Sequence, residues 1–159
     1  MKFFRVMMII PLISPAAFCT PGEVLEKVTK IQVDPTVIEQ PEKVTEAQAG
    51  NLVRYNLRAA IKDAHLEEGN SSVRAHIVLD EFSSDNAARR LVGIGSGRKT
   101  NIVDGKLVIQ DASGKELASV KIHVHGTVAF SAGEGNGEQA HPPTSDLEQR
   151  LIKEIESLK

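Results

Sequence analysis

Two alternating segments joined by a short turn constrain the fold of this chain more than any other feature. Residues 101–111 and 116–127 each alternate apolar and polar side chains, which indicates strands with one buried face. Asp111-Ala112-Ser113-Gly114-Lys115 lies between them and is typical of a hairpin turn, because Asp and Gly tolerate the backbone angles of such turns. The inward positions are Val103, Leu107, Ile109, Ala118, Val120, Ile122 and Val124, and the outward positions of the second strand are Ser119, Lys121, His123 and His125.

Two further strands are predicted before the hairpin. Residues 28–33 are rich in β-branched side chains and end at Asp34-Pro35, where proline removes a donor from any ladder. Residues 73–80 alternate apolar and polar side chains and predict a strand with one buried face. Residues 34–44, with two prolines, predict a loop, and residues 83–90 predict a polar, turn-rich connection.

Two helices are predicted from apolar residues at spacings of three and four. One covers residues 45–67, and Thr45-Glu46-Ala47-Gln48 matches a capping box at its start. The other covers residues 145–158, and Ser145-Asp146-Leu147-Glu148 matches a second capping box. We therefore expect an α+β fold, with a mainly antiparallel sheet of about four strands covered on one face by the helix 45–67. The C-terminal helix is a second candidate to cover that face.

The N-terminus has the three parts of a secretory signal peptide. Lys2 and Arg5 give a basic start, residues 6–13 form a short apolar run, and small residues follow at positions 14–17. The apolar run is too short to span a bilayer, which disfavours a retained transmembrane helix. We expect a signal peptide over 1–19, an α/β domain over 24–130, a Gly/Pro-rich linker over 131–144 and a C-terminal helix over 145–159. The mature chain is then periplasmic or secreted.

The single cysteine, Cys19, lies where processing would occur. A lone cysteine excludes an intramolecular disulfide. Cys19 is also a candidate for lipidation, which would anchor the chain to a membrane, but Phe18 is bulkier than the small residue that a bacterial lipobox has before its cysteine. Simple cleavage between Ala17 and Thr20 is therefore the preferred interpretation.

Charge and composition exclude several classes of partner. Loss of residues 1–19 removes two of the 19 basic residues and none of the 21 acidic ones, which leaves a formal net charge of −4. This balance gives no electrostatic reason to bind nucleic acid or anionic lipid. Aromatic residues make up only 4% of the chain, so the core must be aliphatic and ligand sites of stacked rings are disfavoured. No cofactor is expected.

The glycine-rich stretch 93–100 invites comparison with a phosphate-binding loop. Such a loop has four residues between its glycines and then Lys and Ser/Thr at the start of a helix. Here only three residues separate Gly93 from Gly97, and a strand-like segment follows. The glycines instead favour a bulge or a close crossing of backbones. We treat this stretch as a candidate interaction surface formed by Arg90, Gly93, Gly95, Gly97 and Arg98.

His123 and His125 are the candidates for metal binding. They lie two residues apart on one strand, so their rings project from the same face, and His141 or His76 could supply a third ligand. Solvated histidines on an exposed sheet face are the simpler interpretation. A nucleophilic site is disfavoured, because Ser96 lies in Gly-Ser-Gly and not in the elbow motif of serine hydrolases.

One part of the sequence resembles a known family. Ala88-Arg89-Arg90-Leu91-Val92-Gly93-Ile94-Gly95-Ser96-Gly97, with the segment Leu107 to Leu117 and its Asp-x-x-Gly turn, is similar to the bacterial domain of unknown function 4410. The resemblance covers residues 27–126 and implies an exported envelope domain of α/β structure, with no catalytic residues to transfer. The layout is also similar to the periplasmic domain of curli-secretion lipoproteins.

These observations favour an exported, non-catalytic protein that binds an envelope protein or itself. Exposed strand edges and the stretch from Gly93 to Gly97 are the expected contact surfaces. The alternative is a metal-dependent or hydrolytic periplasmic enzyme that uses His123 and His125. Mass analysis of the mature N-terminus and metal analysis of the purified protein distinguish these hypotheses.

Overall fold

The predicted hairpin forms part of the central sheet in the computed structural model, which describes residues 23–85, 100–128 and 145–159. β5 (Thr100–Asp111) and β6 (Glu116–Gly126) pair antiparallel along their length. The N–H of Asp111 donates to the carbonyl of Lys115 at 2.9 Å and closes the turn. Gly114 has a φ of 85°, a left-handed conformation that glycine adopts without steric cost. The hairpin prediction is confirmed.

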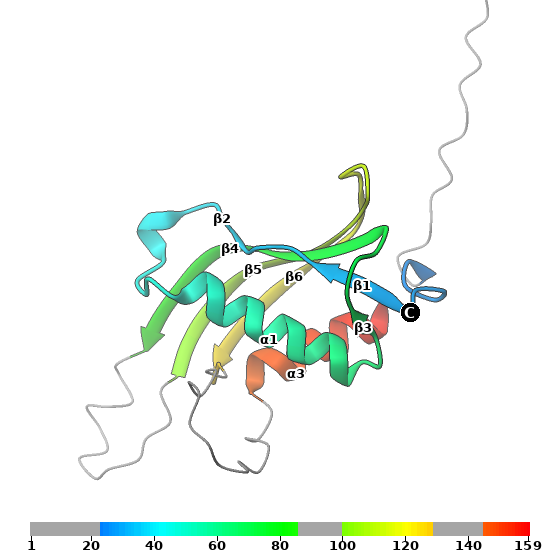
Figure 1. The fold of residues 1–159 in the computed structure, drawn as a ribbon. Coiled ribbons are helices and arrows are strands. Elements are labelled where there is room, and N and C mark those ends of the chain that lie inside the picture. Colours follow the sequence, from blue (N-terminus) through cyan, green and yellow to red (C-terminus); the bar gives the residue numbers. More distant parts are fainter. Residues whose placement is uncertain (1–22, 86–99, 129–144) are drawn as a thin grey trace, which may run out of the picture.

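Four more strands complete the sheet (Figure 1). β4 (Val73–Asp85) pairs antiparallel with β5. β1 (Lys30–Val33) pairs parallel with both β4 and β3 (Glu67–Glu68), and β2 (Val37–Ile38) pairs parallel with β4. The strand order is β3-β1-β4-β5-β6. The α+β class is confirmed, but the sheet is mixed and has six strands, more than the expected four. The two added strands, β2 and β3, have only two residues each, too few for a visible alternation.

The segment 34–44, expected to be a loop, instead follows the edge of β4. The backbone N–H groups of Asp34, Glu39 and Thr45 each donate to a carbonyl of β4, at 2.9, 3.0 and 2.9 Å. A 3-10 helix, η2 (Pro41–Lys43), interrupts this path. The prolines do break the segment as expected, but the residues between them still pair, so the prediction of a loop over the whole segment was wrong.

β4 is longer than predicted and contains a β-bulge. Leu79 pairs with Gly105 and Glu81 with the next residue of β5, which leaves Asp80 unpaired. The extra residue reverses the alternation and turns Phe82 into the core, where it is fully buried. The bulge brings the two backbones together: a Cβ on Gly105 would lie 3.2 Å from the Cα of Leu79 and nearer still to a carbonyl oxygen of β4. The prediction of a turn-rich connection over residues 83–90 was therefore wrong for residues 83–85, which belong to β4. Residues 86–90 lie outside the described residues.

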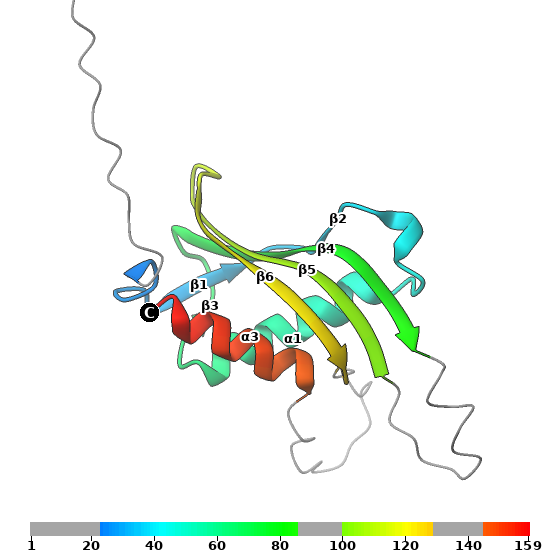
Figure 2. The ribbon, with the colours of Figure 1, turned by 180° about the vertical axis from the view of Figure 1, so that it is seen from behind.

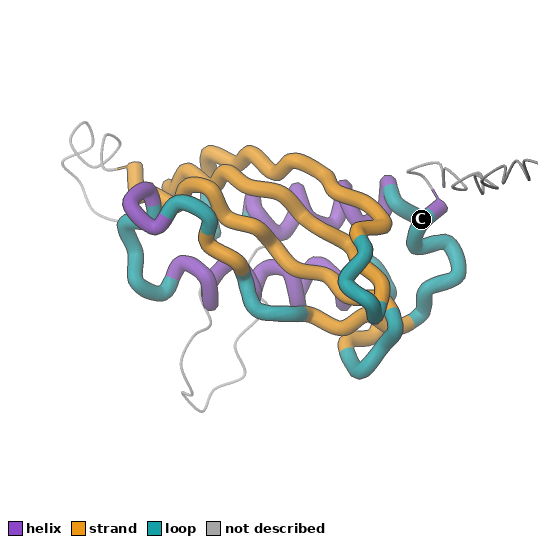
Figure 3. The backbone as a smooth tube through the Cα atoms, turned by 90° about the horizontal axis from the view of Figure 1, so that it is seen from above, coloured by secondary structure: helices purple, strands orange, loops and turns teal. Residues whose placement is uncertain are grey.

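Two helices lie side by side beneath one face of the sheet (Figure 3). They are α1 (Ala49–Asp63) and α3 (Asp146–Ser157), and α3 lies under β6 (Figure 2). The hydroxyl of Ser145 accepts from the backbone N–H of Glu148 at 3.1 Å, which confirms the second capping box. No helix among the described residues is long and apolar enough to span a bilayer.

The first capping box is absent from the structure. The hydroxyl of Thr45 donates to the carbonyl of Phe82 at 3.2 Å, so it does not cap a helix. The helix begins only at Ala49, and Gln48 before it provides no side-chain cap. It also ends earlier than predicted, because His65 has a φ of 59° and the chain then enters β3.

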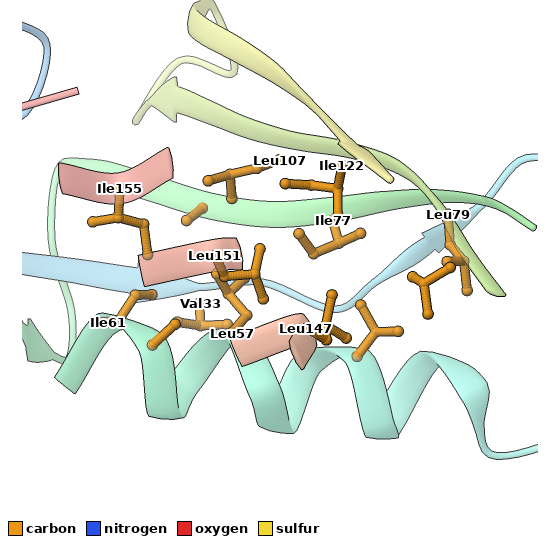
Figure 4. Close-up of a cluster of buried hydrophobic side chains, with 14 of the residues drawn as sticks. Val33, Leu57, Ile61, Ile77, Leu79, Leu107, Ile122, Leu147, Leu151 and Ile155 are labelled. Carbon is orange, nitrogen blue, oxygen red and sulfur yellow. The ribbon is translucent and has the colours of Figure 1, made fainter. Parts of the chain in front are cut away.

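The core between the sheet and the helices is aliphatic except for one phenylalanine (Figure 4). α3 contributes Leu147, Leu151 and Ile155 to this core. The residue that caps the end of α3 is tied to the N-terminal segment, because the N–H of Leu25 donates to the carbonyl of Leu158 at 2.7 Å. The buried side chains from the two helices and the sheet include Leu57, Ile61, Ile77, Leu79, Leu107, Ile122, Leu147, Leu151 and Ile155.

Candidate functional site: the open edges of the sheet

β6 is the last strand on one side of the sheet, and no second strand among the described residues pairs with its outer edge. It is 11 residues long and contains no proline. An edge strand presents a row of unpaired N–H and C=O groups, which is a template for pairing with another chain. The outer edge of β6 is therefore the longest open pairing surface in the described part of the chain.

The side chains of β6 alternate as predicted. Ile122 and Val124 are buried under the sheet, and Lys121, His123 and His125 are exposed on the opposite face. No helix of the described residues covers that opposite face (Figure 3). A cationic side chain and two imidazoles thus line the open strand, and β6 has no acidic residue from Ser119 onward.

His123 has a carboxylate partner that the sequence analysis missed. Its Nδ1 lies within hydrogen-bonding reach of Oδ1 of Asp104, which is directly opposite it on β5. The His123 side chain is 72% exposed and that of Asp104 36%. A carboxylate in this position orients the imidazole and pairs with its protonated form.

The signal for this pair was present in the pattern of the hairpin. The residues that face the core have odd numbers on β5 and even numbers on β6. The numbers of two facing residues must therefore add to an odd number, as those of Asp104 and His123 do. The turn pairs Asp111 with Lys115, whose numbers add to an even number. One strand of the hairpin must therefore contain an extra residue that has no partner on the other strand. The structure places that residue at Leu117, which is 38% exposed.

His76 is not brought to the other histidines. It faces Val108 on β5, four residues along the strand from Asp104, which is about 13 Å at the rise of a strand. Lys106 and Lys121 occupy the row between them. Burial lowers the pKa of His76 below its ordinary value, although the nearby carboxylate of Asp34 acts in the opposite direction.

Among the residues that the structure describes, no group of three His, Cys, Asp or Glu side chains is placed to hold a metal ion. His123 and His125 do share a face of β6, as the sequence predicted. His141, the other suggested third ligand, lies outside the described residues. The metal hypothesis for the two histidines of β6 remains a prediction.

The other candidate residues also lie outside the described parts of the chain. These are the lipidation candidate Cys19 and the glycine-rich interaction candidates Arg90, Gly93, Gly95, Gly97 and Arg98.

The opposite border of the sheet, over residues 34–46, differs in character from β6. It contains Asp34, Glu39, Glu42 and Glu46 but only one basic residue, Lys43. It also carries Val37 and Ile38, which are 47% and 40% exposed and belong to the four large hydrophobic side chains found exposed among the described residues. This acidic edge, residues 34–46, presents apolar and negative groups, whereas β6 presents Lys121 and two imidazoles.

Comparison with known proteins identifies the fold. No family model matches the sequence, and no curated protein matches it. Among solved structures, the chain resembles PelC from Paraburkholderia phytofirmans, described as a dodecamer, with a TM-score of 0.52 and 12% identity over 88% of this chain and 96% of that one. A minor lipoprotein from Acinetobacter baumannii aligns with 65% of this chain and 70% of its own, at 6% identity and a TM-score of 0.34 that establishes no common fold. The chain therefore shares the fold of PelC.

Proposed function

We propose that this chain is an exported, non-catalytic envelope module that acts by assembling with copies of itself or with another envelope protein. The observation that carries the proposal is the fold shared with PelC over nearly the full length of both chains, because PelC forms a dodecamer. The open edge of β6 supports it, since a strand of 11 residues whose outer edge has no neighbouring strand among the described residues can accept a partner strand.

The N-terminal sequence supports export. The basic start at Lys2 and Arg5, the apolar run and the small residues that follow fit a cleaved signal peptide. Membership of the domain of unknown function 4410 family, on the motifs from Ala88 to Leu117, is part of the same proposal. Cleavage that leaves the chain in the periplasm is preferred, and lipidation of Cys19 is the alternative.

An enzyme based on His123 is disfavoured by the position of this residue. Catalytic acid–base groups work best in sites that exclude water, whereas the side chain of His123 is 72% exposed. The double variant His123→Ala/His125→Ala tests the metal-dependent alternative. We expect metal analysis of the purified wild-type chain to find no stoichiometric transition metal. Stoichiometric metal that disappears in the double variant would favour the enzyme.

Co-purification of two differently tagged copies tests the proposed function. Both copies are expressed with their native N-terminus, one with a C-terminal His tag and one with a C-terminal epitope tag, and the envelope fraction is separated from the cytosol. We expect the epitope-tagged copy to co-purify with the His-tagged one from the envelope fraction. Intact-mass analysis of the same sample gives the mature N-terminus and the state of Cys19. Recovery of the full-length chain from the cytosol, with Met1 retained, would contradict the proposal.

A further inference from the structure

We infer that copies of this chain associate edge to edge, with the outer edge of β6 in one copy against the acidic edge, residues 34–46, of the next. The inference rests on the proposed self-association and names the two surfaces that would form the contact. They are the two open borders of the same sheet, so the contact would extend the sheet from one copy into the next.

The strand directions are compatible with such a contact. β2 runs parallel to β4, and β6 is related to β4 by two antiparallel steps through β5, so β6 and β2 run in the same direction. Repetition of the chain across the sheet would therefore place β6 beside β2 of the next copy as parallel neighbours. A head-to-tail contact of this kind closes into a ring when the rotation between copies permits.

The two edges also match in height along the sheet. Lys121 faces Lys106 on β5, which faces Val78 on β4, which in turn faces Val37 on β2. Lys121 at one border is thus level with Val37 at the other. Glu39 lies two residues further along, on the side toward His123, so a neighbouring copy would place its acidic edge beside Lys121.

The charges favour this pairing over pairing of β6 with itself. Lys121 lies at the midpoint of β6, so two antiparallel copies of β6 in register would bring Lys121 against Lys121, and like charges directly opposite are destabilising. Against the acidic edge, Lys121 instead lies near Glu39, two residues from the level of Val37. Glu39 is 52% exposed and is held 3.6 Å from Lys106 of its own chain, a solvated pair that leaves it able to bind a second cation.

The apolar surface of the acidic edge supports the same contact. Val37 and Ile38 are exposed in the single chain, and a strand laid over β2 would remove part of this surface from water. Pro35 and Pro41 bracket these residues. Because proline cannot donate to a ladder, the backbone pairing would be confined to the short run between them, which limits unregulated sheet growth.

A charge-swap series tested by sedimentation velocity decides the inference. Lys121→Glu and Glu39→Lys are made singly and together in the mature chain, with Lys153→Glu on the exposed face of α3 as a control of equal charge change. We expect each single edge variant to raise the concentration for half-dissociation at least about tenfold. The double variant should recover much of the loss because the pair is restored with reversed sign. Lys153→Glu should assemble like the wild type, and all four variants should keep the far-ultraviolet circular dichroism of the folded chain.

The outcomes separate this inference from the proposed function. A wild-type multimer that Lys121→Glu and Glu39→Lys leave intact would overturn the edge contact while the proposed self-association stands. A wild-type chain that is monomeric at every concentration would overturn both. Cross-linking gives an independent check with two single-cysteine chains that lack Cys19, one carrying Val37→Cys and one carrying Lys121→Cys. On oxidation we expect disulfide-linked dimers when the two are mixed, and their absence from the mixture would contradict the contact.

Discussion

Replacement of Leu151 by alanine tests whether α3 is an integral part of the core. Leu151 is completely buried between α1 and the sheet (Figure 4). Leu→Ala at a fully buried site loses the transfer free energy of the removed atoms and leaves a cavity, at a cost of about 3 kcal/mol. For a domain of this size, that loss lowers the melting temperature by roughly 10 °C. The loss of stability should therefore be large compared with the effect of a substitution at an exposed position of the same helix.

Urea unfolding followed by circular dichroism measures this loss. Lys153→Ala is the matched control, because Lys153 is exposed two residues further along α3. All three proteins are compared at one fixed concentration, since association with other copies adds to the apparent stability. We expect Leu151→Ala to unfold at markedly lower urea, whereas Lys153→Ala stays within about 0.5 kcal/mol of the wild type. Equal midpoints for the two variants would show that α3 does not pack as described.

Four further substitutions test local features of the structure. Gly105→Ala should destabilise the fold by about 1–3 kcal/mol, because the added Cβ would meet the backbone of β4. Gly50→Ala in α1, where a Cβ would have no neighbour nearer than 3.7 Å, should stabilise the fold by up to about 1 kcal/mol. Thermal melts that rank the two variants the other way would contradict the bulge geometry. Burial and the nearby carboxylate of Asp63 raise the pKa of Glu148, so the folded chain holds this proton more tightly than the unfolded chain does. The stability that this protonation contributes is complete below pH 4.5 and is lost as the pH rises through the folded-state pKa of Glu148. Glu148→Gln should therefore be as stable as the wild type in urea unfolding at pH 4 and more stable at pH 7. A variant that is more stable than the wild type at pH 4 alone would refute the raised pKa. Asn101 is fully buried, and neither of its side-chain amide atoms has a hydrogen-bond partner among the described residues. Asn101→Leu should therefore raise the free energy of unfolding measured in urea by about 1 kcal/mol, and a clear loss would mean that the amide has a partner.

The sequence predicted those elements whose signal is local. The hairpin around Asp111 and Gly114 was predictable because both the alternation and the turn residues lie within one short segment. The capping box at Ser145 was predictable for the same reason. The equivalent motif at Thr45 failed because the hydroxyl binds the carbonyl of Phe82, which is 37 residues away along the chain. A motif that is satisfied by a distant strand cannot be recognised from its neighbours alone.

The short parallel strands were not predictable from periodicity. Val37 and Ile38 form only a two-residue strand between prolines, and their pairing depends on β4 being alongside. The bulge at Asp80 had one indirect signal, since a glycine in the middle of β5, Gly105, marks a close approach of backbones. Of the candidate site, the outward face of β6 was predicted correctly, but the partner of His123 was missed because the register shift in the hairpin was not considered.

The mass of the assembled particle is the strongest test of the proposed self-association. Native mass spectrometry of the mature wild-type chain, purified from the envelope without cross-linking, gives the number of copies in each particle. We expect one discrete multimer whose mass is a whole-number multiple of that of the mature chain. A spectrum that contains the single chain alone, at every concentration at which the protein can be measured, would contradict it.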